Sequence, residues 1–161
     1  MIELRDITWD NFWDVINLKP METQKNNLLS NAVFMAQAYV NLKLQYQDIC
    51  FAIYYGGNLI GFTKIVFVEE NEETYNFNEE TYFIDALMID ERYQGKGYGG
   101  LALTQILAYI RTKPWGHASS IKLSCYDGNT NAAKLSEKFG FTRTDEFVLG
   151  KEGLRLYTMK G

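Results

Sequence analysis

The sequence predicts a mixed α/β fold of the α+β kind, in which a sheet of parallel and antiparallel strands carries helices on its faces. Three observations support this. Two β-rich runs flank Gly56-Gly57-Asn58, which is turn chemistry typical of a hairpin. The apolar run 81–90 leads through a glycine-rich loop into a helical pattern. Two further β-rich runs, 141–149 and 154–160, are joined by a glycine-containing turn and predict a closing hairpin.

The first part of the chain predicts one strand and two helices. Residues 2–7 alternate apolar and polar side chains, as in a half-buried strand. In residues 9–18 an aromatic stripe at helical spacing is expected to pack in the core, and a ligand wall is the alternative. Residues 24–46 are expected to be helical, with polar interruptions near Asn26 and Asn31. The aromatic stripe consists of Trp9, Phe12, Trp13 and Ile16.

The rest of the chain alternates between strand and helix patterns. Leu103, Ile106, Leu107 and Ile110 form a core-facing stripe at i, i+3, i+4 and i+7. The whole chain therefore reads β α α β β β α β α β β, with seven strands. The remaining strands are expected at 48–55, 58–68, 81–90 and 120–126, and the remaining helices at 98–113 and 129–140.

Length and composition limit the class of protein. With 161 residues the chain is expected to be a single domain, 1–161. A net charge of −4 argues against nucleic acid as the main partner and is compatible with a cationic substrate. Cys50 and Cys125 lie in apolar runs and are expected to be buried thiols of a cytosolic protein.

No targeting or membrane segment is expected. The N-terminal stretch lacks a basic region followed by an apolar run. The longest apolar run, ICFAIYY, is far shorter than the ~20 residues that span a bilayer. We therefore expect a cytoplasmic protein with no membrane partner and no metal site.

Residues 69–80, EENEETYNFNEE, contain six glutamates. The simpler interpretation is a solvated loop between two strands. The functional interpretation is an acidic lip that attracts a polycation.

The stretch YQGKGYGG, residues 93–100, contains two phosphate-binding patterns. Gly95, Gly97 and Gly100 fit G-x-G-x-x-G, which binds dinucleotides. Gln94, Gly97 and Gly99 fit Q-x-x-G-x-G, the pyrophosphate loop of acyl-coenzyme A transferases. In both patterns glycines let backbone N–H groups approach phosphate at a helix N-terminus.

The dinucleotide interpretation lacks its context. That pattern normally follows the first strand of a parallel unit and has an acidic residue about 20 positions further on. Here three other strands come before the strand that leads into the loop, and the first carboxylate after the helix is Asp127. A phosphate-loop NTPase is excluded because no G-K-[ST] follows at the required spacing.

The second interpretation has its context, and the chain resembles the GNAT family of N-acetyltransferases. After the glycine loop, NTNAAKLSEKFGF resembles the family's closing motif, N-x-x-A-x-x-L-Y-E-K-x-G-F. The matched positions include Asn129, Leu135, Glu137, Lys138, Gly140 and Phe141. The resemblance implies a mostly antiparallel sheet of about seven strands with a central splayed parallel pair and helices on both faces.

The N-terminal half also resembles the bacterial spermine/spermidine acetyltransferase-like subgroup. This implies transfer of acetyl from acetyl-CoA to a primary amine by direct attack, with a polyamine as the favoured acceptor. Other amines remain possible, namely an aminoglycoside, an amino acid or a protein N-terminus. A non-catalytic acyl-CoA-binding module is the alternative class, and a homodimer is possible.

The resemblance also implies catalytic roles. The backbone N–H of Leu87 would stabilise the oxyanion. Asp85 is a carboxylate in an apolar strand, where burial would raise its pKa, and is the candidate base. The alternative is an edge or cap aspartate that faces water. Ser136 stands where the family motif has the tyrosine that protonates the thiolate. Tyr126, Tyr98 or water could take that role, or no acid is needed.

The residues expected to bind acetyl-CoA lie on the strand, in the glycine loop, at the start of the following helix and before the last helix. Ile89 would pair with the pantetheine arm like an added strand. Asn129 could anchor the strand end or the pantetheine, cap the last helix, or do both. The full set is Leu87, Met88, Ile89, Gln94, Gly95, Lys96, Gly97, Tyr98, Gly99, Gly100 and Asn129.

Overall fold

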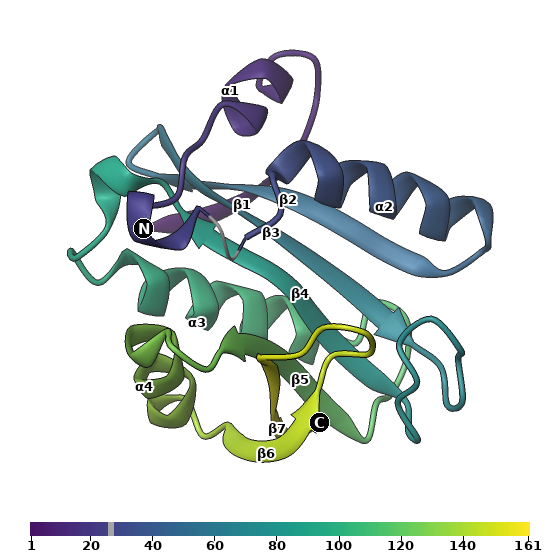
Figure 1. Ribbon diagram of the computed structural model, residues 1–161. Helices are drawn as coiled ribbons and strands as arrows, with labels where there is room; N and C mark the ends of the chain where they lie inside the picture. Colours follow the sequence, from purple (N-terminus) through teal and green to yellow (C-terminus); the bar gives the residue numbers. More distant parts are fainter. Residues whose placement is uncertain (26–27) are drawn as a thin grey trace. The chain divides into compact units, whose positions relative to one another are not determined.

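The computed structural model describes residues 1–25 and 28–161, and its elements follow the predicted order (Figure 1). Two short 3-10 helices, η1 and η2, are additional to that order. The elements are β1 (Ile2–Asp6), α1 (Phe12–Ile16), η1 (Glu22–Gln24), α2 (Asn31–Lys43), β2 (Gln47–Tyr55), β3 (Asn58–Val68), β4 (Thr81–Ile89), η2 (Glu91–Tyr93), α3 (Tyr98–Arg111), β5 (Ser120–Tyr126), α4 (Thr130–Lys138), β6 (Thr142–Phe147) and β7 (Leu154–Lys160).

The strands form a seven-stranded sheet in the order β1-β2-β3-β4-β5-β7-β6. The neighbours β4 and β5 are parallel, whereas β1 with β2, β5 with β7 and β6 with β7 are antiparallel. The β4–β5 pairs run from Thr81↔Ser120 to Ile84↔Leu123, although β4 continues to Ile89 and β5 to Tyr126. The predicted mixed sheet with a central parallel pair is therefore confirmed.

The chain divides into two compact units. The first comprises Met1–Ile65 and Ala86–Pro114, and the second comprises Val66–Asp85 and Trp115–Gly161. Strands β3 and β4 each contribute residues to both units. That the whole chain acts as one domain stays a prediction.

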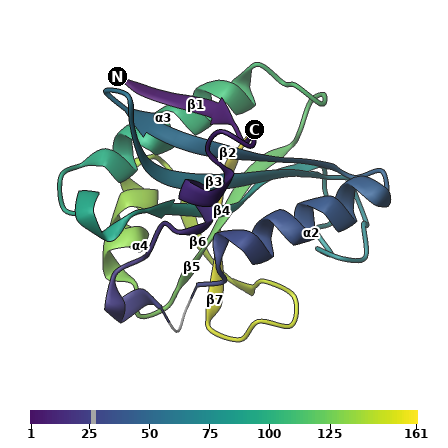
Figure 2. The ribbon, with the colours of Figure 1, turned by 90° about the horizontal axis from the view of Figure 1, so that it is seen from above.

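In the first unit, helices cover both faces of the strands (Figures 1 and 2). Ala52 of β2 belongs to a buried cluster with Val15, near the end of α1, and Phe34 of α2. The next residue, Ile53, belongs to a second cluster with Ala102 of α3. Successive strand residues point to opposite faces, so α1 and α2 lie on one face and α3 on the other.

Helix α3 has the core-facing stripe that its sequence predicts. Leu103, Ile106, Leu107 and Ile110 are all at most 3% exposed. The predicted β2–β3 hairpin is also present, because Gly56 and Gly57 form its turn with φ of 56° and 80°. Two successive positive φ values match the twist of a tight hairpin and favour glycine.

The expected core role of the first aromatic stripe is wrong. Trp9 is 81% exposed and Trp13 is 63% exposed, although Phe12 contacts both rings edge to face. Helix α1 spans only five residues and turns Val15, which is fully buried, toward α2 and the sheet. The helix predicted in residues 9–18 is confirmed only for Phe12–Ile16, and the side chain that it buries is Val15, which the predicted stripe did not include.

Helix α2 is shorter than predicted and has an unusual distribution of polarity. The expected helix 24–46 is confirmed only for Asn31–Lys43, and its positions 26 and 27 lie outside the described residues. Two asparagines, Asn31 and Asn41, are buried, while several large apolar side chains point to solvent. Asn31 donates to the carbonyl of Val15 (2.9 Å) and Asn41 donates to the carboxylate of Asp48 (2.7 Å). The exposed apolar residues of this helix are Val33, Tyr39, Val40 and Leu42.

The second unit has an aromatic core. Phe83 of β4 packs edge to face against Phe77 and Tyr75 of the β3–β4 connection, with ring centroids 5.4 and 5.8 Å apart. These contacts tie the glutamate-rich segment 69–80 to the sheet. Tyr82 holds the turn before β5, because its hydroxyl donates to the carbonyl of Gly116 (2.9 Å) and accepts from the N–H of Trp115 (3.1 Å).

Both cysteines are free thiols, with Cys125 buried and Cys50 half-buried. Among the described residues, no helix is long and apolar enough to cross a membrane.

Candidate functional site

The glycine loop is shaped by two residues in the left-handed region. Gly95 has φ of 74° and Gly97 has φ of 81°, a conformation that disfavours residues with a β-carbon. A β-carbon built at either position meets no atom within 4 Å. The glycines therefore serve the backbone conformation and leave open space beside the loop, as a phosphate cradle requires.

Helix α3 begins directly at this open space. Gly97 is its N-cap, and no side chain caps the helix. The N–H groups of Tyr98, Gly99 and Gly100, in the first turn, have no acceptor inside a helix, and the helix dipole places about half a positive charge there. The arrangement can bind an anion through backbone donors.

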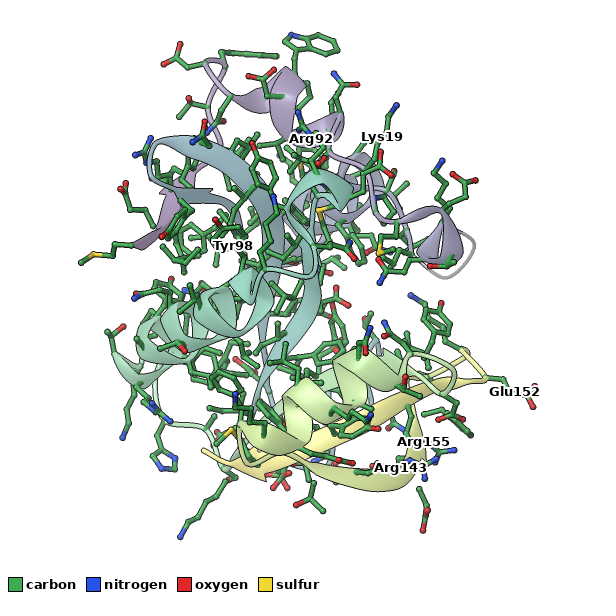
Figure 3. All side chains as sticks on the ribbon, turned by 90° about the vertical axis from the view of Figure 1, so that its left-hand side faces the viewer. Lys19, Arg92, Tyr98, Arg143, Glu152 and Arg155 are labelled. Carbon is green, nitrogen blue, oxygen red and sulfur yellow. The ribbon has the colours of Figure 1, made fainter. Side chains whose placement is uncertain are left out.

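Asp90, which sequence reasoning missed, fixes the path of the chain from β4 to the loop. It is 2% exposed, and its carboxylate accepts from the Nε of Arg92 (2.6 Å), the N–H of Arg92 (3.1 Å) and the N–H of Lys19 (3.0 Å). Figure 3 shows the side chains of Lys19 and Arg92 next to each other at this end of the first unit. Burial raises the pKa of Asp90, but the hydrogen bonds from Arg92 and Lys19 outweigh it and hold the pKa below its ordinary value. The signal in the sequence was an aspartate at a helix N-cap.

Gln94, the first residue of the predicted pyrophosphate motif, uses its side chain inside the protein. Its Nε2 donates to the carbonyl of Ile89 (2.7 Å) and to Oε1 of Gln24 (3.2 Å). The side chain thus closes the loop onto the end of β4. It shapes the loop whether or not it also touches a ligand.

Two more loop residues have defined surroundings. Lys96 is exposed, and its Nζ donates to the carbonyl of Arg92 (3.2 Å), which keeps a positive charge at the loop. The ring of Tyr98 packs against Tyr55 (4.7 Å between centroids) and Tyr93 (6.4 Å). The loop is thus braced by aromatic side chains on one side and carries a cation at its surface.

The end of β4 precedes the loop in the same unit. Leu87 is half-buried and packs with Ile89 in the cluster that includes α3. Met88 is buried in the other cluster, and its sulfur is 3.8 Å from Nδ2 of Asn31, so only its backbone could meet a ligand. Gly61 of β3 allows a close approach here, because a β-carbon on it would lie 2.4 Å from the carbonyl oxygen of Met88.

The remaining predicted site residues belong to the second unit. Asp85 is half-buried between Ile84 and Ala86, both of which are buried, so the burial expected for its carboxylate is only partial. Tyr126 ends β5 and is also half-buried. Asn129 caps α4, since its Oδ1 accepts from the N–H of Ala132 (3.1 Å), which confirms the N-cap interpretation.

Ser136 has no catalytic surroundings. It is 3% exposed, and its hydroxyl donates to the carbonyl of Ala132 one turn earlier (2.8 Å). The Sγ of Cys125 lies 3.6 Å from the same hydroxyl, and burial raises the pKa of that thiol. This serine fills a packed contact between α4 and β5.

Within residues 1–25 and 28–161, no group of three or more His, Cys, Asp or Glu side chains is arranged to hold a metal ion.

Comparison with protein families identifies the family of this chain. The model of the Acetyltransferase (GNAT) family matches residues 5–141. The chain belongs to the GNAT family. It is therefore an N-acetyltransferase enzyme, and its family's acyl donor is acetyl-CoA, for whose pyrophosphate the glycine cradle at α3 is suited.

Several known GNAT proteins are similar over nearly the whole chain. A spermine/spermidine N(1)-acetyltransferase of Bacillus subtilis (strain 168) is 29% identical over 152 residues, which cover 94% of each protein. The PaiA N-acetyltransferase of Thermoplasma acidophilum, solved with coenzyme A, has a TM-score of 0.69 at 13% identity and covers 100% of this chain and 99% of its own. A chimera of the Vibrio cholerae spermidine N-acetyltransferase SpeG has a TM-score of 0.68 at 20% identity, covering 99% and 94%. These structural likenesses show the shared fold.

Proposed function

We propose that this GNAT protein transfers acetyl from acetyl-CoA to a primary amine of a polyamine such as spermidine or spermine. Binding of acetyl-CoA is supported chiefly by the conformation of Gly97. This residue is the left-handed N-cap of α3, no side chain caps the helix there, and a β-carbon at this position would meet no atom within 4 Å. The polyamine part is supported by the similar Bacillus subtilis protein, whose name specifies spermine and spermidine.

In this proposal the glycine loop holds the donor. The N–H groups of Tyr98, Gly99 and Gly100 bind the pyrophosphate, and the charge of Lys96 adds to the field of the helix. Gln94 and Asp90 keep the loop in shape through the contacts described above. The pantetheine arm lies along the backbone of β4, where the N–H of Leu87 stabilises the oxyanion.

The acceptor needs a group that removes its proton. Amines are protonated at neutral pH, because their pKa is about 10, and only the neutral amine attacks the thioester carbonyl. We assign this task, or the binding of the ammonium, to Asp85. Attack forms the C–N bond and a tetrahedral oxyanion at the N–H of Leu87. Collapse of this intermediate breaks the C–S bond, the nitrogen gives up its second proton, and the products are the acetylated amine and coenzyme A.

The departing thiolate takes up a proton, and Ser136 is poorly suited to supply it. Its hydroxyl is buried and already donates to the carbonyl of Ala132. Tyr126 is the candidate donor in this chain. Water is the alternative, since a thiol with a pKa near 8.5 is a good leaving group without a side-chain acid.

The test is turnover measured as release of free thiol from acetyl-CoA with a panel of amines. The panel contains spermine, spermidine, a monoamine, an aminoglycoside and a peptide with a free N-terminus. We expect the highest kcat/KM with spermine or spermidine. A higher value with the peptide or the aminoglycoside would refute the polyamine assignment, and no thiol release with any of them would refute the proposed activity.

A further inference from the structure

The second unit contains a cavity of about 520 Å³ between the β3–β4 connection and strands β5, β6 and β7. This volume is typical of small-molecule sites, which range from roughly 300 to 1,000 Å³. Its lining is mixed: aromatic and aliphatic side chains alternate with two asparagines, Asn76 and Asn78, and with three charged side chains. The apolar walls are Tyr75, Phe77, Phe147, Leu149 and Leu156, and the charged residues are Glu79, Lys122 and Glu146.

The exposed apolar side chains of this unit gather at the cavity. Phe147 is 39% exposed and Leu149 is 55% exposed. In the described part of the chain, they are the large hydrophobic side chains that the second unit leaves exposed, and both line this cavity. Apolar surface rimmed by polar groups is typical of a binding groove.

The charges at the edge favour a cation. Lys122 donates to the carboxylate of Glu79 (2.6 Å) and to the hydroxyl of Ser120 (3.0 Å), so its charge is already compensated. The hydrogen bond from Lys122 lowers the pKa of Glu79, which keeps that carboxylate ionised at neutral pH. Glu146 adds a second carboxylate, which is exposed and, among the described residues, forms no ion pair. The cavity therefore carries a net negative charge.

The aromatic walls offer apolar surface to a methylene chain, whereas their cation contacts are made by side chains of the protein. The Nζ of Lys122 lies 5.5 Å from the ring centroid of Phe77, and the guanidinium of Arg155 lies 4.5 Å from that of Phe147. Both rings thus already stand in cation–π contact with a side chain. Methylene groups between two ammonium groups could pack on the same apolar surface while the nitrogens stay near the carboxylates.

The cavity also lies close to Asp85 along β4. Phe83 precedes Asp85 by two residues, or about 7 Å of strand. Its ring packs against Phe77 and Tyr75, two of the cavity walls. Two walls of the cavity are thus in contact with the strand segment that carries Asp85.

We propose that this cavity binds a distal ammonium group of a di- or polyamine acceptor. The methylene chain lies on Phe77 and Phe147, and the ammonium faces Glu146 and Glu79. The proposal rests on the amine acetylation proposed above and narrows the acceptor to an aliphatic amine with at least two cationic nitrogens.

The experiment compares charge changes at the cavity with matched changes elsewhere. Glu146→Gln removes a cavity carboxylate, and Glu152→Gln removes one from the neighbouring β6–β7 turn, where it points away from the ribbon (Figure 3). Leu149→Arg places a positive charge at the exposed wall, and Leu149→Gln changes the shape of that wall without the charge. For each variant, KM is measured with spermidine and with a monoamine of similar length, and spermidine binding is measured by calorimetry.

We expect Glu146→Gln to raise the KM for spermidine about two- to fivefold, the range of an exposed ion pair. Leu149→Arg should raise it about tenfold or more, because like charges in a binding site repel strongly. The monoamine KM and the two controls should stay near wild type. The calorimetric Kd for spermidine should follow the same pattern.

The two proposals fail in different ways. Equal changes for spermidine and the monoamine, or no change with Leu149→Arg, would overturn the cavity assignment and leave polyamine acetylation standing. Spermidine that binds, but is not acetylated, with a Kd weakened by Leu149→Arg would support the cavity and overturn the proposed activity. Absence of spermidine binding to the wild-type protein would overturn the cavity assignment directly.

Discussion

Replacement of Gly97 by asparagine tests the acyl-donor site, and Gly153 provides a matched control. Gly97 has φ of 81° and Gly153 has φ of 83°, and a β-carbon at either position meets no atom within 4 Å. Asparagine tolerates this left-handed region better than other residues with a side chain. Valine is less informative, because a β-branched residue there would mix backbone strain with any effect on the ligand.

The expected magnitudes follow from these geometries. Each substitution should lower the free energy of unfolding by a similar amount, about 1 kcal/mol, because the backbone conformations match. Only the side chain of Gly97→Asn enters the space in front of α3. Loss of two N–H contacts to phosphate, at about 1.5–3 kcal/mol each, would weaken coenzyme A binding by about 10²–10⁴-fold.

The assay is calorimetric titration with coenzyme A, together with urea unfolding of the three proteins. We expect Gly97→Asn to bind at least about a hundredfold more weakly, and Gly153→Asn to bind like wild type. Equal affinities for the two variants would refute the assignment of the phosphate cradle. A wild-type Kd for coenzyme A in Gly97→Asn, with the expected loss of stability, would also refute it.

Four further outcomes are expected. Asp85→Asn should lower kcat about 10²–10⁴-fold if the carboxylate moves a proton, or raise the amine KM if it only binds the ammonium, and wild-type values of both constants would exclude both roles. Ser136→Ala should change kcat less than about tenfold, below the effect of a lost catalytic acid, because its hydroxyl is held by Ala132. The pKa of Asp90 is held below its ordinary value of 3.8, so its ionised carboxylate stabilises the fold above that pH, and this contribution is lost as the pH falls further. In urea titrations Asp90→Asn should therefore have a lower free energy of unfolding than wild type at pH 7. It should also lose less of that free energy on acidification. If Glu69–Glu80 attract a polycation over the Debye length of ~10 Å at 0.1 M salt, kcat/KM for spermine should fall more steeply with salt than for a monoamine, and equal slopes would leave the segment a solvated loop.

Sequence patterns predicted the elements whose signals are local. The strand, loop and helix from Thr81 to Arg111 could be placed because apolar runs, glycines and a 3.6-residue period occur next to one another. The bounds of β5 and β7 were also predicted, since turn residues flank both. The glycine loop before α3 could be located in the same way, because its pattern of glycines is local in the sequence.

The features that depend on distant contacts could not be predicted. The exposure of Trp13 follows from the rotation of α1, which is fixed by the packing of Val15 against other elements. The burial of Ser136 depends on Cys125, eleven residues away on another element. The cavity between segment 69–80 and the closing hairpin joins residues as far apart in the sequence as Tyr75 and Leu156, and no local pattern indicates it.

Polar contacts set the rotation of helix α2 about its own axis. Val33 and Val40 are exposed, whereas the helix keeps Asn31 and Asn41 buried, each with a hydrogen-bonded partner. The two amides therefore favour this rotation of the helix, because another rotation would separate them from the groups that they bond. Substitutions on the outer face of this helix should then have little effect on stability. A change of either asparagine would leave its partner without a hydrogen bond unless the partner changed too.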